Sequence, residues 1–374
     1  MSQFPRHSLI LTIVLFIVAS CAPGANAGPL PTLLVVATSA AGGASARATD
    51  ASRSTQASRL SSTQNPSQTF TPTPPPKSLT LCLSTEPDSL YQYRAYGSRA
   101  KYLAAEHVRQ ALFDGPIDTA GFERKPVILE SLPTLENGGA LIETVTVKTG
   151  ERYYDAAKDI VAEWPNADAQ MQRLVMTYTL RPAVLWSDGA PLTADDSVFA
   201  FEVLAGGGFD PTMQPDYLPA LVQRTQSYEA LDDRTVRWTG LPGFLDRTAL
   251  ATFSTFFTPL PRHQFGGSDP TQLTTNIDIT HQPIGWGPYV MTEWVVGESI
   301  KLARNPRYFR AAEGLPRIDA LTFRFVPDAA SALADLTAGK CDVVLHDSFG
   351  RKQADLIPAI DAAAAQGGLV AQYA

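Results

Sequence analysis

A long low-complexity stretch, residues 22–78, limits where this 374-residue chain can fold. It consists mainly of Ala, Ser, Thr, Gly and Pro and ends in the run Thr71–Pro76. Few large apolar side chains follow Val36, so burial cannot offset the entropy of ordering the stretch. We therefore predict a disordered tether that becomes stiffer toward its proline-rich end, and a folded part that begins near Leu79. The cluster Leu33–Val36 is an exception that this interpretation does not explain.

The residues before the tether have the pattern of a secretory signal. Arg6 and His7 precede an apolar run, Leu9–Val18, that is too short for an ordinary membrane span. The run ends in Val18-Ala19-Ser20-Cys21, which resembles the bacterial lipobox. The resemblance implies a lipoprotein signal peptide over residues 1–21 and lipid attachment at Cys21. The tether would then hold the folded part away from the membrane.

The folded part opens with the order of an α/β protein. Leu79–Ser84 is a mostly apolar run, which is typical of a buried strand. Ser98–Leu112 has a helical pattern, and Gly115-Pro116 stops it. A strand followed by a helix favours a parallel sheet. We expect further strands at 174–180, 234–239, 289–296, 298–304, 321–326 and 342–345, and helices that begin at Thr193 and Asp328.

Charge and motifs argue against nucleic-acid binding and against catalysis. The formal net charge of -7 leaves no overall attraction to nucleic acid. The sequence contains no G-x-S-x-G, H-E-x-x-H or P-loop motif, and its histidines lack metal-like spacing. We predict a protein that is not an enzyme and has neither a metal nor a cofactor. An enzyme whose catalytic groups are far apart in the sequence is the alternative.

Two cysteines follow the tether, Cys82 and Cys341. Each lies in a short apolar segment, which favours two buried free thiols. A disulfide is the alternative outside the cytoplasm. Spacing in the sequence cannot place the two residues within bonding distance.

Five motifs stand in order between Leu79 and Leu345. They are STEPDSL at 84–90, WSDGAPLTADDSV at 186–198, GWGPY at 285–289, NPRYF at 305–309 and AGKCDV at 338–343. The set resembles family 5 of the extracellular solute-binding proteins, the peptide, dipeptide and nickel binders of ABC importers. The third motif departs from the family's G-T-G-P-Y, because Trp286 replaces the threonine.

The residue types in these motifs indicate mainly structural roles. Asp188-Gly189 suits a turn, and Trp186 suits a large buried anchor. Gly285 and Gly287 suit positions where a side chain would collide with neighbouring backbone.

The resemblance implies an α/β fold of the type II periplasmic-binding-protein class, with two lobes and the ligand between them. It assigns residues 79–114 and 226–347 to lobe one, and residues 115–225 to an inserted α+β domain. Residues 348–374 would start the crossover to lobe two, after a hinge near His346–Ser348. We expect the second lobe to be absent from this chain.

The resemblance also suggests ligand contacts. The loop after Leu90 faces the cleft in the family, which implies contacts from Tyr96, Gly97 and Ser98. Tyr217 and Trp286 are the other two expected contacts.

The function implied is that of a substrate-binding lipoprotein. It would capture peptides or similar small solutes outside the cytoplasmic membrane and deliver them to ABC permease subunits. Its partners would be the ligand, the permease and, through Cys21, the membrane, with no nucleic acid. A ligand-sensing extracytoplasmic domain is the first alternative, and a secreted hydrolase is the second. The ligand, and whether the site is periplasmic or on the outer face of the membrane, stay open.

Overall fold

The computed structural model describes residues 36–37, 76–94, 97–121, 123–209, 217–345, 353–365 and 369–370. All of these residues fall within the structural unit Thr32–Ala374. The expected signal peptide with Cys21, the ligand contact Tyr96 and the hinge near His346–Ser348 lie outside the described residues. None of the helices in the described ranges is long and apolar enough to cross a membrane.

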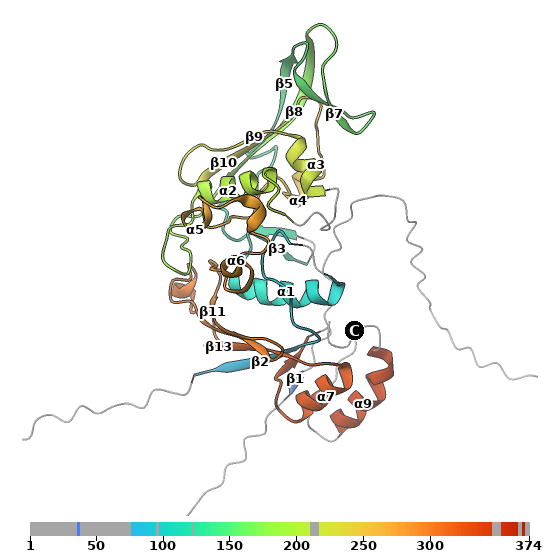
Figure 1. The fold of residues 1–374 in the computed structure, drawn as a ribbon, viewed down its shortest axis with the longest axis vertical. Coiled ribbons are helices and arrows are strands. Elements are labelled where there is room, and N and C mark those ends of the chain that lie inside the picture. The colour runs from blue at the N-terminus through green and yellow to red at the C-terminus, as the bar shows by residue number, and fades with distance from the viewer. Residues whose placement is uncertain are drawn as a thin grey trace, which may run out of the picture. The chain divides into compact units, whose positions relative to one another are not determined.

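A seven-stranded sheet with the order β11-β12-β13-β2-β14-β1-β15 organises one part of this unit (Figure 1). Its central strand β2 (Ser78–Leu83) pairs in parallel with β13 (Ala320–Phe325) and β14 (Val343–Val344). The hairpin of β11 (Tyr289–Val295) and β12 (Ser299–Arg304) extends the sheet antiparallel to β13. Parallel pairing, as predicted from the first strand and helix, is therefore confirmed for β13, β2 and β14, but the sheet is mixed because its other neighbouring pairs are antiparallel.

Two very short strands complete the other edge of this sheet. β1 (Val36–Ala37) lies between β14 and β15 (Leu369–Val370), and Val36 pairs antiparallel with Val343 and Val370. An unpaired sheet edge can accept any extended segment, because its N–H and C=O groups need partners. These two residues differ from the disordered tether expected over 22–78. Residues 38–75 of that stretch lie outside the described ranges.

A four-stranded antiparallel sheet has the order β5-β8-β10-β9. Its strands are β5 (Ala140–Val147), β8 (Ala169–Thr179), β10 (Thr235–Gly240) and β9 (Thr225–Ala230). This arrangement corrects the expected boundary between residues 225 and 226, because β9 and β10 belong to the same sheet as β8. The second part of the fold therefore continues to at least residue 240. Periodicity identified β10 as a strand, but it carries no information about which strand is its partner.

Two small hairpins and several helices complete the described fold. Helices α7 (Ala329–Thr337) and α9 (Gln353–Ala365) contact each other and lie side by side in Figure 1. The hairpins pair β3 (Ile117–Ala120) with β4 (Glu123–Pro126), and β6 (Arg152–Asp155) with β7 (Ile160–Glu163). The helices are α1 (Arg99–Leu112), α2 (Ala194–Ala205), α3 (Tyr217–Gln223), α4 (Ala249–Thr252), α5 (Arg262–Phe265), α6 (Ile277–His281), α7 (Ala329–Thr337) and α9 (Gln353–Ala365), with 3-10 turns η1 (Pro270–Gln272) and η2 (Ala311–Glu313).

Polar residues at the predicted positions start three of these helices. The Ser98 hydroxyl accepts a hydrogen bond from the backbone N–H of Lys101 at the start of α1. At α2 the N-cap is Thr193, and its backbone N–H donates to the Asp196 carboxylate at 2.9 Å. Asp328 caps α7 in the same way as Ser98 caps α1. Each cap satisfies N–H groups that have no partner within the helix.

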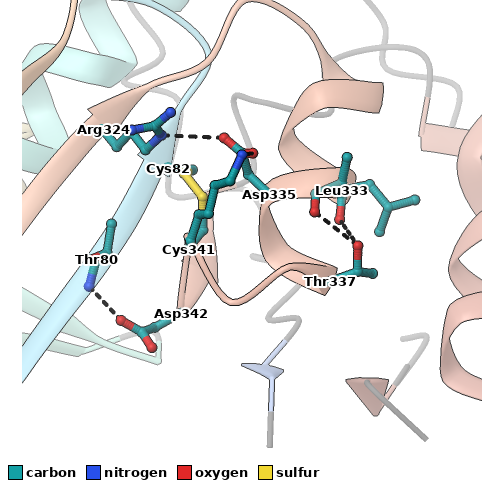
Figure 2. Close-up of a disulfide and its surroundings, with 10 residues drawn as sticks. Thr80, Cys82, Arg324, Leu333, Asp335, Thr337, Cys341 and Asp342 are labelled. Atoms are coloured by element: carbon teal, nitrogen blue, oxygen red, sulfur yellow. Dashed lines mark hydrogen bonds and ion pairs between the residues drawn. A yellow bond between two sulfur atoms is a disulfide. The ribbon is translucent and has the colours of Figure 1, made fainter. Parts of the chain in front are cut away.

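The two cysteines of the folded part form a disulfide, which corrects the expectation of two free thiols. Cys82 lies in β2 and Cys341 lies just before β14, with their Cα atoms 5.9 Å apart (Figure 2). Parallel pairing of β2 with β14 brings together residues that are separated by 259 positions in the sequence. Both cysteines are fully buried. Thr80 and Asp342 add a backbone-to-carboxylate hydrogen bond of 2.7 Å beside the disulfide.

Candidate ligand-binding site

The carboxyl ends of the three parallel strands β13, β2 and β14 meet at one edge of the seven-stranded sheet. Phe325 is in register with Leu83, and Val344 is in register with Cys82. The chain therefore leaves all three strands at the same edge. In open α/β sheets, ligands bind outside the carboxyl ends of parallel strands. This edge is the candidate site.

The turn between β11 and β12 lies at the same edge, because Ser299 of β12 pairs with Arg324 of β13. Gly297 allows the turn through its positive φ of 76°. The neighbouring Val296 is 78% exposed, a large value for an aliphatic residue. The turn thus presents an apolar side chain at the edge where the parallel strands end.

Glu86 fixes this turn to the loop that follows β2. One carboxylate oxygen accepts a hydrogen bond from the indole Nε1 of Trp294 at 2.6 Å. The other oxygen accepts from the backbone N–H of Gly297 at 2.9 Å. A carboxylate that bridges two donors holds both segments in one geometry, and such charge-assisted bonds are the stronger ones in proteins. Glu86 therefore positions the edge of the site.

Contacts with α6 and η1 hold the middle of the loop. The backbone N–H of Leu90 donates to the Thr280 carbonyl at 2.7 Å, and Arg94 donates to the Thr274 carbonyl at 3.3 Å. The His281 ring packs on Trp294 with 4.6 Å between the ring centroids. Burial lowers the pKa of His281, and the positive charge of Arg94 lowers it further, against an opposing effect of Glu86. The lowered pKa favours the neutral form of the His281 ring.

The end of the loop is tied to the first turn of α1. Lys101 and Asp88 form an ion pair of 2.5 Å, and Ser98 caps the helix. Gly97 is exposed, and a Cβ added there would meet only Asp88, at 3.7 Å. The loop therefore has fixed ends and an open surface at Gly97 and Ser98.

The structure places the predicted ligand contacts in three different regions. Gly97 and Ser98 lie together at the start of α1 and are exposed. Tyr217 is the first residue of α3, in the part of the fold that contains the four-stranded sheet, and its side chain is outside the description. Trp286 lies near the other end of α1, which is about 20 Å long. Only Gly97 and Ser98 are therefore brought together.

Trp286 is fully buried, which corrects its expected position in the cleft. Its ring packs edge-to-face against Phe113 and Trp186, with centroid distances of 5.1 and 5.2 Å. Its indole N–H donates to the Asp114 carbonyl at 2.9 Å. Every part of the side chain thus has a protein partner, and Trp286 acts as a core residue.

Three of the five motifs meet around Trp286 and Trp186, and the structural roles expected of Trp186, Gly189 and Gly285 are confirmed. Trp186 is buried and donates to the Asp196 carboxylate, and Gly189 adopts a positive φ of 104° in the turn after it. A Cβ on Gly285 would lie 2.0 Å from the Leu112 carbonyl oxygen, so only glycine fits there.

The NPRYF motif joins the other two motifs. The Asn305 side-chain amide donates to the Gly287 carbonyl at 2.8 Å. Arg307 donates to the Ser187 carbonyl at 2.9 Å. The backbone N–H of Ser187 in turn donates to the Gly285 carbonyl at 2.8 Å. The motifs therefore connect the end of α1, the start of β11 and the turn before α2.

Sequence reasoning missed Glu86, Trp294 and Val296 as residues that build the site. Glu86 stands inside the first motif, so a carboxylate directly after a buried strand was an available signal. Its partners lie 208 and 211 positions away, beyond the reach of local patterns.

Beneath the loop, Leu90, Tyr91 and Phe113 border a cavity of only about 10 Å³, so the loop packs closely on the core.

Among the described residues, no group of three or more His, Cys, Asp or Glu side chains could hold a metal ion. Fixed loops around an open strand edge are suited to noncovalent binding of a small molecule.

The family follows from a match over more than half of the chain. The profile of the bacterial extracellular solute-binding proteins, family 5 (Middle), matches residues 160–368. The chain belongs to this family, which consists of solute-binding proteins and not of enzymes. The family assignment made from the five motifs and the prediction that the protein is not an enzyme are confirmed.

Individual relatives agree with this assignment. The chain is 33% identical to the oligopeptide-binding protein AppA of Bacillus subtilis over 168 residues, which are 44% of the chain and 29% of AppA. It is 30% identical to a putative ABC transporter peptide-binding protein of Brucella ovis over 177 residues, 46% of the chain and 31% of that protein. The chain therefore spans about a third of the length of these curated relatives.

Solved structures show the same fold over a larger part of the chain. AppA of Bacillus subtilis, solved with a nonapeptide, matches 71% of the chain and 44% of its own length, with a TM-score of 0.51 and 22% identity. The oligopeptide-binding protein of Thermus thermophilus, solved with a pentapeptide, matches the same shares with a TM-score of 0.52 and 22% identity. These likenesses support the mixed α/β fold.

Proposed function

We propose that this protein is the substrate-binding component of an ABC importer and captures peptides or similar small solutes outside the cytoplasmic membrane. The observation that carries the proposal is the loop after β2, in which Glu86 binds the turn between β11 and β12 and Asp88 pairs with Lys101 of α1, beside the carboxyl ends of the parallel strands. Several relatives are named as putative ABC transporter peptide-binding proteins, and another as an oligopeptide-binding protein. The ligand would lie on this edge, with Tyr96, Gly97 and Ser98 among its contacts and Tyr217 as a further one.

A ligand on this edge would use backbone groups more than charged side chains. Glu86 and Asp88 already have partners within the protein, Trp294 with Gly297 and Lys101 respectively. Chain segments that leave strand ends carry N–H and C=O groups that an extended peptide can pair with. Val296 adds apolar surface beside them. This combination favours ligands with a peptide backbone and tolerates different side chains.

A bulky residue at Gly97 tests the position of the ligand. Gly97→Phe should weaken ligand binding at least tenfold and leave the melting temperature unchanged, because a Cβ fits there without a close contact. Native mass spectrometry of the protein purified from its host would first identify the ligand, and titration calorimetry would then measure its affinity. Gly267→Phe is a matched control, because Gly267 is also exposed and has nothing within 4 Å of an added Cβ.

Two contrary outcomes have different meanings, one for the place where the ligand binds and one for solute binding itself. Equal affinity of both variants and the wild type would place the ligand away from Gly97. A protein that carries no small molecule from its host and binds none of a peptide mixture would argue against solute capture itself.

We also propose that Cys21 carries the lipid that holds the protein at the membrane. Cys21→Ala should move the protein from the membrane fraction of the host to the soluble fraction, because the thiol that receives the lipid is lost. Immunoblots of the two fractions provide the measurement. Ser20→Ala is the control, since it keeps a small residue before the cysteine and should leave fractionation unchanged. Membrane association of the Cys21→Ala protein would contradict lipid anchoring at this residue.

A further inference from the structure

A hollow of about 490 Å³ lies outside the seven-stranded sheet, among β6, the end of α3 and the loop after β10. Its volume is in the range of small-molecule sites. The lining residues combine two aromatic rings, a guanidinium, a carboxylate and small apolar groups. They are Tyr154, Ala156, Arg224, Gly243, Phe244, Leu245 and Asp246.

Arg224 is held in place by three neighbours. Its guanidinium carbon lies 4.9 Å from the centre of the Tyr154 ring and 5.5 Å from that of Phe244. Its Nη2 donates to the Asp159 carboxylate at 2.5 Å. Among the described residues, its Nε and Nη1 groups have no protein acceptor. Two donor nitrogens of a fixed guanidinium are therefore available beside the hollow, which suits a carboxylate.

Asp246 supplies the opposite charge. One of its carboxylate oxygens accepts hydrogen bonds from the backbone N–H groups of Thr248 and Ala249, at 2.8 and 3.2 Å. The other oxygen has no protein donor within the described ranges. The two backbone hydrogen bonds fix the orientation of the carboxylate. Its other oxygen can accept a hydrogen bond from an ammonium group.

The walls between these charges are rigid and largely apolar. Tyr154 and Phe244 pack edge-to-face with 5.0 Å between their centroids. The Tyr154 N–H donates to the Pro242 carbonyl at 2.8 Å, and a Cβ on Gly243 would lie 2.3 Å from the Tyr154 carbonyl oxygen. Leu245 and Ala156 complete an apolar surface for a small side chain.

We propose that this hollow is a second binding site, which takes a small zwitterion of the α-amino acid class, its carboxylate on Arg224 and its ammonium on Asp246. The site belongs to the part of the fold that contains the four-stranded sheet and uses none of the residues of the Glu86–Ser98 loop. It would allow the protein to respond to free amino acids independently of the solute that it captures.

Saturation-transfer NMR with L-leucine tests the proposal on the full-length protein. Wild-type protein should bind leucine, and Arg224→Gln and Asp246→Asn should each weaken binding by about tenfold or more, because each removes one charge-assisted contact. Asparagine keeps the oxygen that caps Thr248 and Ala249, so Asp246→Asn should fold normally. Arg237→Gln is the control, since Arg237 also pairs with a carboxylate, that of Glu229, on the four-stranded sheet away from the hollow.

Two analogues test each charge of the ligand. 4-Methylpentanoate lacks the ammonium group and 3-methylbutylamine lacks the carboxylate, so both should bind at least about tenfold more weakly than leucine. If Arg224→Gln fails to fold, Ala156→Phe decides, since its ring would fill the hollow from an exposed position.

The proposal would be overturned if the wild-type protein did not bind leucine, or if the hollow variants bound leucine as tightly as the wild type does. It would also be overturned if either analogue bound the wild type as tightly as leucine. The hollow variants should keep the affinity for the solute captured at the strand edge. A loss of that solute alone, with leucine binding intact, would count against the proposed transport function and not against this site.

Discussion

Replacing Cys82 and Cys341 together by alanine should lower the free energy of unfolding by about 3–5 kcal/mol. The bond joins residues 259 positions apart, so it removes a large amount of conformational freedom from the unfolded chain. The expected fall in melting temperature is on the order of 10 °C for a domain of this size. Differential scanning calorimetry without reductant measures it.

The buried position of the disulfide adds a second expected result. Both cysteines are fully buried, under a cluster that includes Val326, Leu333 and Leu336. A reductant should therefore leave the bond intact in the folded protein and reduce it once the protein unfolds. Thiol labelling followed by mass spectrometry, with and without denaturant, distinguishes the two states. Cys21→Ala serves as the control substitution, because it leaves this disulfide unchanged.

The opposite outcome would support the two buried free thiols that the sequence favours. An unchanged melting temperature, together with two free thiols after denaturation without reductant, would show two buried thiols that merely pack together. The family assignment would not change in that case, because it does not depend on the disulfide.

Local sequence patterns predicted the individual elements well because the signals are local. The helix from Ser98 to Leu112 has its cap and its apolar face within one segment, and the structure has α1 there. The turn at Gly297 needs only a residue that tolerates a positive φ between two alternating runs. These features depend on interactions between residues close in sequence, and a single chain displays them.

Long-range partners could not be predicted in the same way. The pairing of β10 with β8 places Trp238 opposite Met176, which no local pattern records. The disulfide and the bridge from Glu86 to Gly297 likewise join residues more than 200 positions apart. Predicting such contacts requires knowledge of the sheet order, and the sheet order in turn depends on the whole chain.

The placement of Trp286 was wrong for a related reason. Its motif position was assigned to the cleft because the corresponding position faces the cleft in the family, and the tryptophan was expected to point the same way. The structure instead turns the indole toward Phe113 and Trp186, where its N–H reaches the Asp114 carbonyl. A tryptophan with a partner for its N–H is stable in a core, so size alone did not determine its direction.

Trp286→Ala should therefore act on stability and not on ligand binding. Removing a fully buried indole leaves a cavity and an unpaired Asp114 carbonyl, for an expected loss of about 3–5 kcal/mol in the free energy of unfolding. Urea unfolding followed by circular dichroism measures this loss. Ligand affinity, measured where the variant is still folded, should stay within about twofold of the wild type.

Trp164→Ala is the matched control for this substitution. Trp164 also packs edge-to-face against an aromatic ring, that of Tyr153 at 5.1 Å, and donates its indole N–H to the Ala167 carbonyl at 2.8 Å. It is only partly buried, so its loss should cost about 1–2 kcal/mol, because less apolar surface returns to water. Equal stability losses in the two variants, with weaker ligand binding by Trp286→Ala alone, would show that the Trp286 side chain faces the ligand, as the motif had suggested. A larger loss of stability for Trp286→Ala than for Trp164→Ala, with unchanged ligand affinity, would establish Trp286 as a core residue. The departure from the family motif would then stabilise the packing at the end of α1.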